Sequence, residues 1–190
     1  MKDFVRDNLW FSLCGLNCGL CPMKLDGYCP GCGGGEGNQS CKIARCSRQH
    51  GEVEYCSRCQ DFPCEKYGGI DEFDSFITHQ NRRKDLEKND RIGVAAYREE
   101  QKEKIEILKF LLENFNDGRR KTFFCLAVNL LELSVLEMVL AQIKEDEKLG
   151  SLPSKERAAC VVKLLQDVAG QRRITLKLRK KNAGEKSYDK

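Results

Sequence analysis

"CGLNCGLCP", residues 14–22, places three thiols in a Cys-x3-Cys-x2-Cys pattern and ends on a Cys-Pro pair. This spacing is used by proteins that hold an iron–sulfur cluster, and the Cys-Pro ending is typical of ferredoxin-type cysteine runs. The second and third cysteines are also spaced like one half of a zinc site. The stretch therefore indicates a metal centre and leaves the choice of metal open.

Most of the cysteines of the chain continue this pattern. The ten that lie close together are Cys14, Cys18, Cys21, Cys29, Cys32, Cys41, Cys46, Cys56, Cys59 and Cys64. Few large apolar side chains accompany them, so a hydrophobic core alone would not order this segment. A structural zinc ion can supply about 10–16 kcal/mol of folding free energy. We therefore interpret the ten thiols as metal ligands.

The expected location of the chain also favours metal over disulfide bonds. The first residues, "MKDFVRDNLWFSL", are charged and lack the apolar segment of a signal peptide, and no run of 18 apolar residues predicts a membrane span. We expect a cytoplasmic protein without a membrane segment. Thiols stay reduced in that compartment and remain available to metals.

Two further Cys-x2-Cys pairs make zinc the preferred ion. They are "CPGC", residues 29–32, and "CSRC", residues 56–59, and Gly33 relieves the turn after the first pair. We predict two zinc ions, each held by four thiolates drawn from the ten cysteines, with two cysteines left over. The alternative is an iron–sulfur cluster on Cys14, Cys18 and Cys21. His50 is a further possible ligand, although a solvated turn histidine is the more ordinary interpretation.

These motifs together resemble a known family. The matching segments are "CGLNCGLCP", "CPGCG", "CKIARC" and "CSRCQDFPCEK". Over about residues 12–67 the chain resembles the uncharacterised cysteine-rich family filed as domain of unknown function thirty-seven ninety-five. Members often have one more cysteine shortly before the position of Cys41, where this chain has Asn38 or Ser40. The resemblance implies a metal-binding module and brings no established activity.

Beyond Asp71 cysteines become rare and the pattern becomes helical. Ile105, Leu108, Leu112 and Phe115 recur at helical spacing and predict a helix within residues 92–116. Further helices are predicted from about residues 122 to 133, 134 to 150 and 153 to 170. Cys125 and Cys160 lie among apolar neighbours and are predicted to be small buried residues of this part.

The last part of the chain alternates apolar and polar residues. Ile174, Leu176 and Leu178 predict a short strand, which would pair with "LWFSL", residues 9–13. The predicted fold class is therefore α+β. A small irregular cysteine-rich metal-binding module, residues 1–69, would pack on an α-helical domain, residues 70–171, followed by a short strand and basic tail, residues 172–190.

Charge is concentrated at the end of the chain. Residues 1–69 are neutral, whereas residues 170–190 carry a net charge of +6 and account for the overall +4. Nucleic acid or another polyanion is a possible partner of this tail, and Arg173, Thr175, Lys177 and Arg179 would form its binding face. Aromatic residues are not interleaved with these cations, Tyr188 excepted, which argues against a nucleic-acid binder.

Three cations precede one predicted helix. Arg119, Arg120 and Lys121 stand before the helix that begins near Thr122, where the helix dipole is already positive. A bound anion or phosphate would relieve the repulsion, and the ordinary alternative is that the three side chains extend into water.

No sequence motif identifies an enzyme. The chain has two histidines and lacks the metalloprotease and serine-hydrolase patterns. The preferred function is a non-catalytic zinc-binding protein that acts as an interaction or scaffold module for another protein. The alternative is an iron–sulfur protein that transfers electrons or senses redox state.

Overall fold

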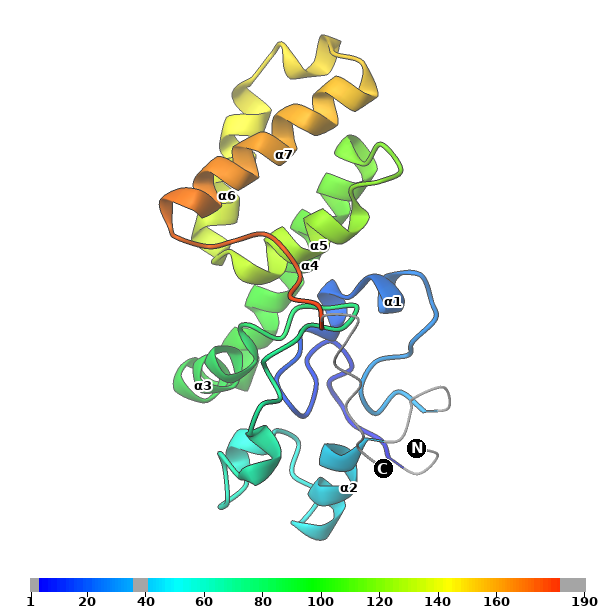
Figure 1. Ribbon diagram of the computed structural model, residues 1–190, viewed down its shortest axis with the longest axis vertical. Coiled ribbons are helices and arrows are strands. Elements are labelled where there is room, and N and C mark those ends of the chain that lie inside the picture. The colour runs from blue at the N-terminus through cyan, green and yellow to red at the C-terminus, as the bar shows by residue number, and fades with distance from the viewer. Residues whose placement is uncertain (1–3, 36–40, 182–190) are drawn as a thin grey trace.

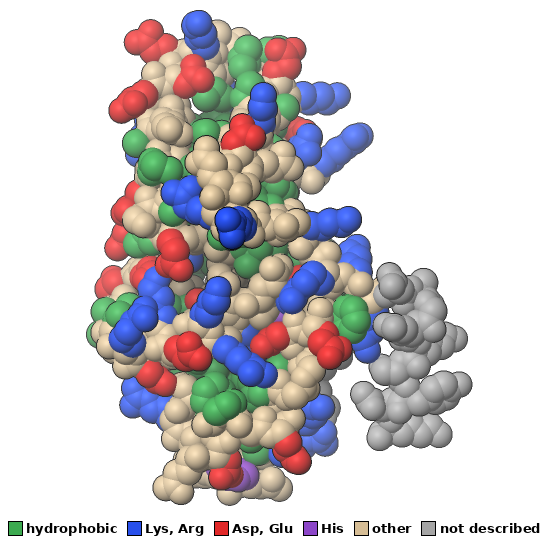
Figure 2. All heavy atoms as spheres, turned by 60° about the vertical axis from the view of Figure 1, so that its left-hand side comes forward, with side chains coloured by type: hydrophobic (Ala, Val, Ile, Leu, Met, Phe, Trp, Pro, Cys, Tyr) green, Lys and Arg blue, Asp and Glu red, His purple; other side chains and the backbone are tan. Residues whose placement is uncertain are grey.

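The computed structural model of the chain describes residues 4–35 and 41–181. Its regular secondary structure is helical, and the molecule is elongated, with the cysteine-rich part at one end and helices α6 and α7 at the other (Figure 1). Side chains of both signs are mixed over the face that Figure 2 turns forward. None of the described helices is long and apolar enough to cross a membrane.

The cysteine-rich part has only short helical turns. They are η1 (Cys18–Leu20), α1 (Pro22–Leu25), α2 (Lys42–Gln49), η2 (Cys56–Arg58) and η3 (Glu65–Tyr67). The helices of the second part are longer. They are α3 (Arg82–Ile92), α4 (Val94–Phe115), α5 (Lys121–Leu130), α6 (Leu133–Glu145), η4 (Leu149–Ser151) and α7 (Ser154–Gln171).

Helix α4 is the centre of the molecule. It packs against α3, α5, α6 and α7, and its residues Leu108 and Leu111 are completely buried in the main core. The helical spacing of the apolar residues predicted this element. Its start is set by Gly93, which ends α3 and precedes α4 with a φ of 86°, a conformation that glycine adopts without strain.

The cysteine-rich part is joined to the helices by buried contacts. Leu20 of η1 belongs to the main core, and η1 packs on both α4 and α5. Gly15 lies against α3 with a φ of 92°, and a Cβ atom there would stand 2.3 Å from the carbonyl oxygen of Arg82. The two parts therefore share a packed boundary, and their division into separate folding units stays a prediction.

A buried polar network crosses the same boundary. Asn17 Nδ2 donates to Asp85 Oδ2 at 2.7 Å, and the Tyr97 hydroxyl donates to Asn17 Oδ1 at 3.3 Å. Burial raises the pKa of Asp85 to about 7, although the nearby Lys104 charge and the bond from Asn17 act in the opposite direction. Burial also lowers the pKa of Lys104. Asn17 Nδ2 also lies 3.4 Å from Asn129 Oδ1 of α5, so this network fixes the loop before Cys18 against three helices of the second part.

The predicted α+β class is wrong, because the described residues form no sheet and the fold is all-α. Their one β-type pairing is an isolated bridge between Val5 and Gly34. Residues 9–13 form no strand, and Phe11 and Leu13 are buried in small cores of the cysteine-rich part.

The segment predicted as the second strand is extended but has no strand partner among the described residues. Ile174 and Leu176 pack on the main core, while Thr175 and Lys177 are exposed. The alternation of residue types therefore reflects an extended chain that lies on helices. We call residues 173–181 the C-terminal strap; residues 182–190, with Tyr188, lie outside the described part.

The strap joins the end of α7 to the segment around Asp74. It leaves α7 and returns across the helices toward the cysteine-rich part (Figure 1). There the Asp74 backbone N–H donates to the Arg179 carbonyl at 2.7 Å, and Arg179 Nη2 lies 3.0 Å from Asp74 Oδ1. The prediction for the remaining cysteines was half right, because Cys125 is buried in the main core whereas Cys160 of α7 is exposed.

Candidate metal centre

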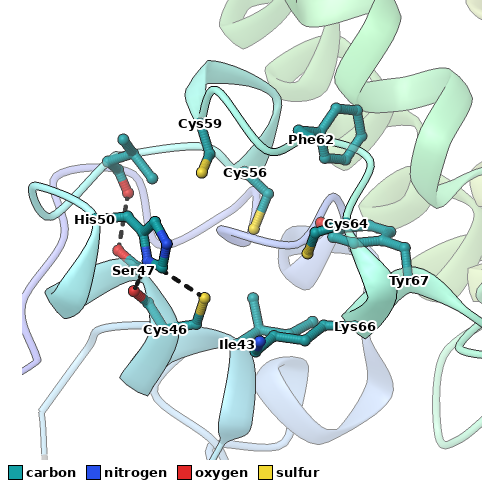
Figure 3. Close-up of a pocket in the computed structure, with 11 residues that line it drawn as sticks. Ile43, Cys46, Ser47, His50, Cys56, Cys59, Phe62, Cys64, Lys66 and Tyr67 are labelled. Carbon is teal, nitrogen blue, oxygen red and sulfur yellow. Dashed lines mark hydrogen bonds between the residues drawn. The ribbon is translucent and has the colours of Figure 1, made fainter.

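Four of the predicted ligands surround one cavity. Cys46 comes from α2, Cys56 from η2, and Cys59 and Cys64 stand at the end of η2 and the start of η3. We call these four residues the first thiol group. Figure 3 shows their sulfur atoms pointing into the space between the three elements. The cavity measures about 30 Å³, which is room for an ion or a water molecule and too little for an organic substrate.

Local hydrogen bonds set the turns that carry these thiols. The Cys59 backbone N–H donates to the Cys56 carbonyl at 3.0 Å, and the Phe62 N–H donates to the Cys59 carbonyl at 3.1 Å. The Tyr67 N–H closes the next turn on the Cys64 carbonyl at 2.9 Å. The Cys-x2-Cys spacing therefore forms a tight turn, as the sequence predicted, with both sulfur atoms on the cavity side.

The surroundings of Cys56 keep its thiol buried. Burial raises the pKa of Cys56 to about 12, and a hydrogen bond from the Tyr67 hydroxyl acts in the opposite direction. That hydroxyl also lies 3.3 Å from the carbonyl oxygen of Cys14. Tyr67 is 1 % exposed and packs edge-on against Phe62. One aromatic side chain thus contacts the cysteines at both ends of the segment.

His50 and Lys66 line the same cavity. His50 Nδ1 lies 2.9 Å from the Cys46 carbonyl oxygen, and its Nε2 lies 3.2 Å from Asp61 Oδ2. Both ring nitrogens therefore face oxygen atoms, and this arrangement suits a supporting residue better than a metal ligand. The Cys46 thiolate is the main cause of the raised pKa of Lys66, so the ammonium group lies within reach of the first thiol group.

A second set of thiols lies around Cys18 and Cys32. Burial raises the pKa of Cys18 to about 12. The charges of Cys32, Cys14 and Cys21 raise it as well. Burial likewise raises the pKa of Cys32, whose neighbours of like charge are Cys14 and Cys41. We call Cys14, Cys18, Cys32 and Cys41 the second thiol group. The remaining two, Cys21 and Cys29, are neighbours of each other.

Backbone N–H groups act on several of these thiols. Those of Cys32 and Leu13 act to lower the pKa values of Cys18 and Cys32, respectively. Those of Met23 and Lys24 act to lower the pKa of Cys21. Such donors stabilise a thiolate and are common around metal-bound cysteines. These backbone groups oppose the effect of burial without outweighing it, so the pKa values of Cys18, Cys21 and Cys32 all stay raised.

Arg6 links the two thiol groups and was missed by the sequence analysis. Its buried guanidinium donates to the Cys32 carbonyl at 3.4 Å and to the Phe11 carbonyl at 2.9 Å. It also forms an ion pair with Glu54 at 2.9 Å, just before the cysteines of η2. A single arginine belongs to no spacing pattern, and Tyr67 and Lys66 escaped notice for the same reason.

The thiols are neighbours but do not yet form a coordination sphere. Over residues 4–35 and 41–181, no group of three or more His, Cys, Asp and Glu side chains is close enough to hold a metal ion as it stands. The structure thus brings the first thiol group to one cavity and makes the members of the second group electrostatic neighbours. Which cysteines bind metal stays a prediction.

The three cations before α5 have different surroundings. Arg120 Nε lies 3.4 Å from Asp117 Oδ2, and Lys121 forms an ion pair with Asp26. Arg119 is exposed and lines a surface groove. The anion site predicted for the three side chains remains untested, and the carboxylates of Asp117 and Asp26 weaken its rationale, because they already offset two of the positive charges.

The comparisons with known proteins give no family and no relative. No protein-family model, no curated protein and no solved structure matches the chain significantly. The resemblance over residues 12–67 to the cysteine-rich family therefore stays an expectation from the motifs alone.

Proposed function

We propose that the cysteine-rich part is a non-catalytic module that folds around two structural zinc ions and serves as an interaction or scaffold element for another protein. The observation that carries the proposal is the first thiol group, whose four sulfur atoms point from three separate elements into one cavity (Figure 3). Four thiolates are the commonest complete ligand set of a structural zinc ion.

The size of the cavity supports zinc over an iron–sulfur cluster at this position. A space of about 30 Å³ has room for one ion. A cluster contains several iron and sulfide ions and needs more space than a single ion. Four thiolates around one Zn²⁺ leave an excess of negative charge, which the Lys66 ammonium group beside Cys46 would offset.

The second thiol group is the proposed site of the other zinc ion. Cys18 and Cys32 are its central members. Cys14 and Cys41 belong to it because their charges raise the pKa of Cys32. This division leaves Cys21 and Cys29 as the pair outside both sites. An iron–sulfur cluster on Cys14, Cys18 and Cys21 is the competing proposal, because all three thiols of the opening motif are electrostatic neighbours.

Metal analysis of protein purified without oxygen tests both proposals. We expect two equivalents of zinc and a colourless protein. Cys59→Ser should lose about one equivalent, and so should Cys32→Ser, because each removes a ligand from a different site. The matched control is Cys160→Ser, whose exposed thiol belongs to neither group and should leave two equivalents.

Specific results would contradict the assignment. A brown protein that contains iron and sulfide and absorbs visible light would replace zinc by the cluster. Loss of zinc from Cys21→Ser or Cys29→Ser, with none lost from Cys32→Ser, would show that the second ion has a different ligand set.

A further inference from the structure

A large groove lies between the C-terminal strap and the start of α5. Its volume is about 1030 Å³, and Phe123, Leu126, Leu176 and Leu178 provide its apolar surface. The basic residues of the groove are Arg119, Lys177, Arg179 and Lys180. We call this surface the strap groove. The strap groove differs from the thiol cavity in its lining, because none of the described residues that line it is a cysteine.

The charge of the strap groove is of one sign. No Asp or Glu is among the described residues that line it. Arg179 is held by Asp74, whereas Arg119, Lys177 and Lys180 are exposed and form no salt bridge with any described carboxylate. Three cations without close counter-charges on one concave surface attract a polyanion. Lys177 and Arg119 reach this surface from different elements, so only the folded chain brings them together.

Aromatic side chains stand beside these cations. Phe123 lines the groove and is half-buried. Phe76 is 65 % exposed and borders a small adjoining cavity, which shares Thr122, Leu126 and Leu178 with the groove. The linear sequence separates Phe76 and Phe123 from the strap, and this separation is why the sequence argued against a nucleic-acid binder. The fold removes that objection.

We propose that the strap groove binds single-stranded nucleic acid. Arg119, Lys177 and Lys180 would contact phosphates, bases would stack on the exposed ring of Phe76, and Phe123 would add apolar contact from the wall of the groove. Cations beside aromatic rings are the usual combination in sequence-tolerant single-strand binding. The groove offers no helix or hairpin shaped for the major groove of a duplex. This role is independent of the proposed zinc sites.

Binding of a fluorescent thymidine oligonucleotide to the full chain, followed by anisotropy over a range of salt concentrations, tests the charge component. In the triple variant Arg119→Gln, Lys177→Gln, Lys180→Gln we expect the slope of log K against log salt to become shallower by about 2, since each phosphate contact contributes about 0.7 on a single strand. The matched control is Lys148→Gln, Lys155→Gln, Lys163→Gln, which removes the same charge from exposed positions outside the groove. It should leave the slope nearly unchanged.

The stacking component needs its own variant. Phe76→Leu keeps an apolar side chain at an exposed position, so the fold should survive, as circular dichroism can verify. We expect an affinity loss of about tenfold for the oligonucleotide, with an unchanged salt slope and no loss for inorganic polyphosphate, which has no bases.

Several outcomes would overturn the proposal. They are duplex binding as tight as single-strand binding, an unchanged affinity in both groove variants, and equal losses in the triple variant and its control. Tighter binding to anionic lipid vesicles than to the oligonucleotide would assign the groove to a membrane surface. Zinc content serves as an independent readout, because the groove variants should retain both equivalents whether or not the oligonucleotide binds.

Discussion

The cysteine-rich part and the helical part are stabilised in different ways. The helical part has a core of 20 buried residues built around α4, of which only Leu20 comes from the cysteine-rich part. The cysteine-rich part has two small cores of five and four residues, and the larger one borrows Leu86 and Tyr97 from the helices. Burial of apolar surface is the main source of folding free energy, so the helices can account for their own stability. The smaller cores cannot do the same for residues 14–64. This part therefore requires cross-links, and thiols around metal ions would provide them.

Removal of metal should produce the largest difference in stability between the two parts. Chelation should remove on the order of 10 kcal/mol from the cysteine-rich part, because the metal-bound form of such modules is the folded form. We expect rapid proteolysis between residues 41 and 64 and a largely retained helical signal in circular dichroism. Loss of the whole helical signal would instead mean that Leu20 and Asn17 make the chain one cooperative unit.

A cavity in the main core should destabilise the helical part and leave the proposed zinc sites intact. Leu108→Ala removes a completely buried side chain of α4 and should lower the free energy of unfolding by about 2–5 kcal/mol. Urea unfolding followed by circular dichroism measures the change, and zinc content should stay at two equivalents. Leu112→Ala, at a half-buried position on the same helix, is the matched control and should cost less. Release of zinc by Leu108→Ala would contradict the contrast between the parts.

Arg6 should matter to the cysteine-rich part alone. Arg6→Met removes a buried guanidinium that satisfies the carbonyls of Asn8 and Phe11, and we expect a loss of about 2–3 kcal/mol. The readout is faster transfer of zinc to a competing chelator. Arg45→Met, at an exposed position of α2, changes the same residue type and should leave the transfer rate unaltered.

The buried network at the boundary predicts a dependence on pH. The folded chain holds a proton on Asp85 up to about pH 7, whereas an unfolded aspartate loses it near pH 4. The folded state therefore binds more protons between these values, and its stability falls as pH rises, by about 2 kcal/mol from pH 5 to 7.

Comparison with two asparagine variants isolates this contribution. Asp85→Asn should flatten the decrease in stability from pH 5 to 7, as measured by urea unfolding at each pH. Asp167→Asn, at an exposed position of α7, should retain the decrease of the native chain. A steep decrease that persists in Asp85→Asn would assign the effect to other titratable groups, and Lys104 is not one of them, because a lowered lysine pKa makes stability rise with pH.

The sequence predicted what depends on neighbours along the chain. The periodic apolar residues of α4 identified a helix, and the Cys-x2-Cys pair at residues 56–59 identified a tight turn, because both patterns express local geometry. The same reasoning placed Cys125 in the core. It was wrong for Cys160, since apolar neighbours along α7 do not reveal which face of the helix a residue occupies.

The sequence could not predict what depends on the path of the chain. Alternating residues at 174–178 indicated an extended segment, but only the fold shows that helices, and not a second strand, cover its apolar side. The grouping of Cys46 with the cysteines of η2 and η3 depends on where α2 packs, and spacing carries no such information. Phe76 lies in the small cavity beside the strap groove through the same kind of long-range contact.

The close approach of Gly15 to α3 has a consequence for how this module can be moved between proteins. The "CG" of the opening motif reads as a metal-binding feature, yet a side chain at residue 15 would collide with the Arg82 carbonyl, a helix residue far along the chain. Part of the cysteine signature therefore encodes the attachment of the module to its neighbour. Residues 14–64 transplanted alone would keep their thiols and lose the surface against which they are oriented, so a portable unit must extend at least through α3.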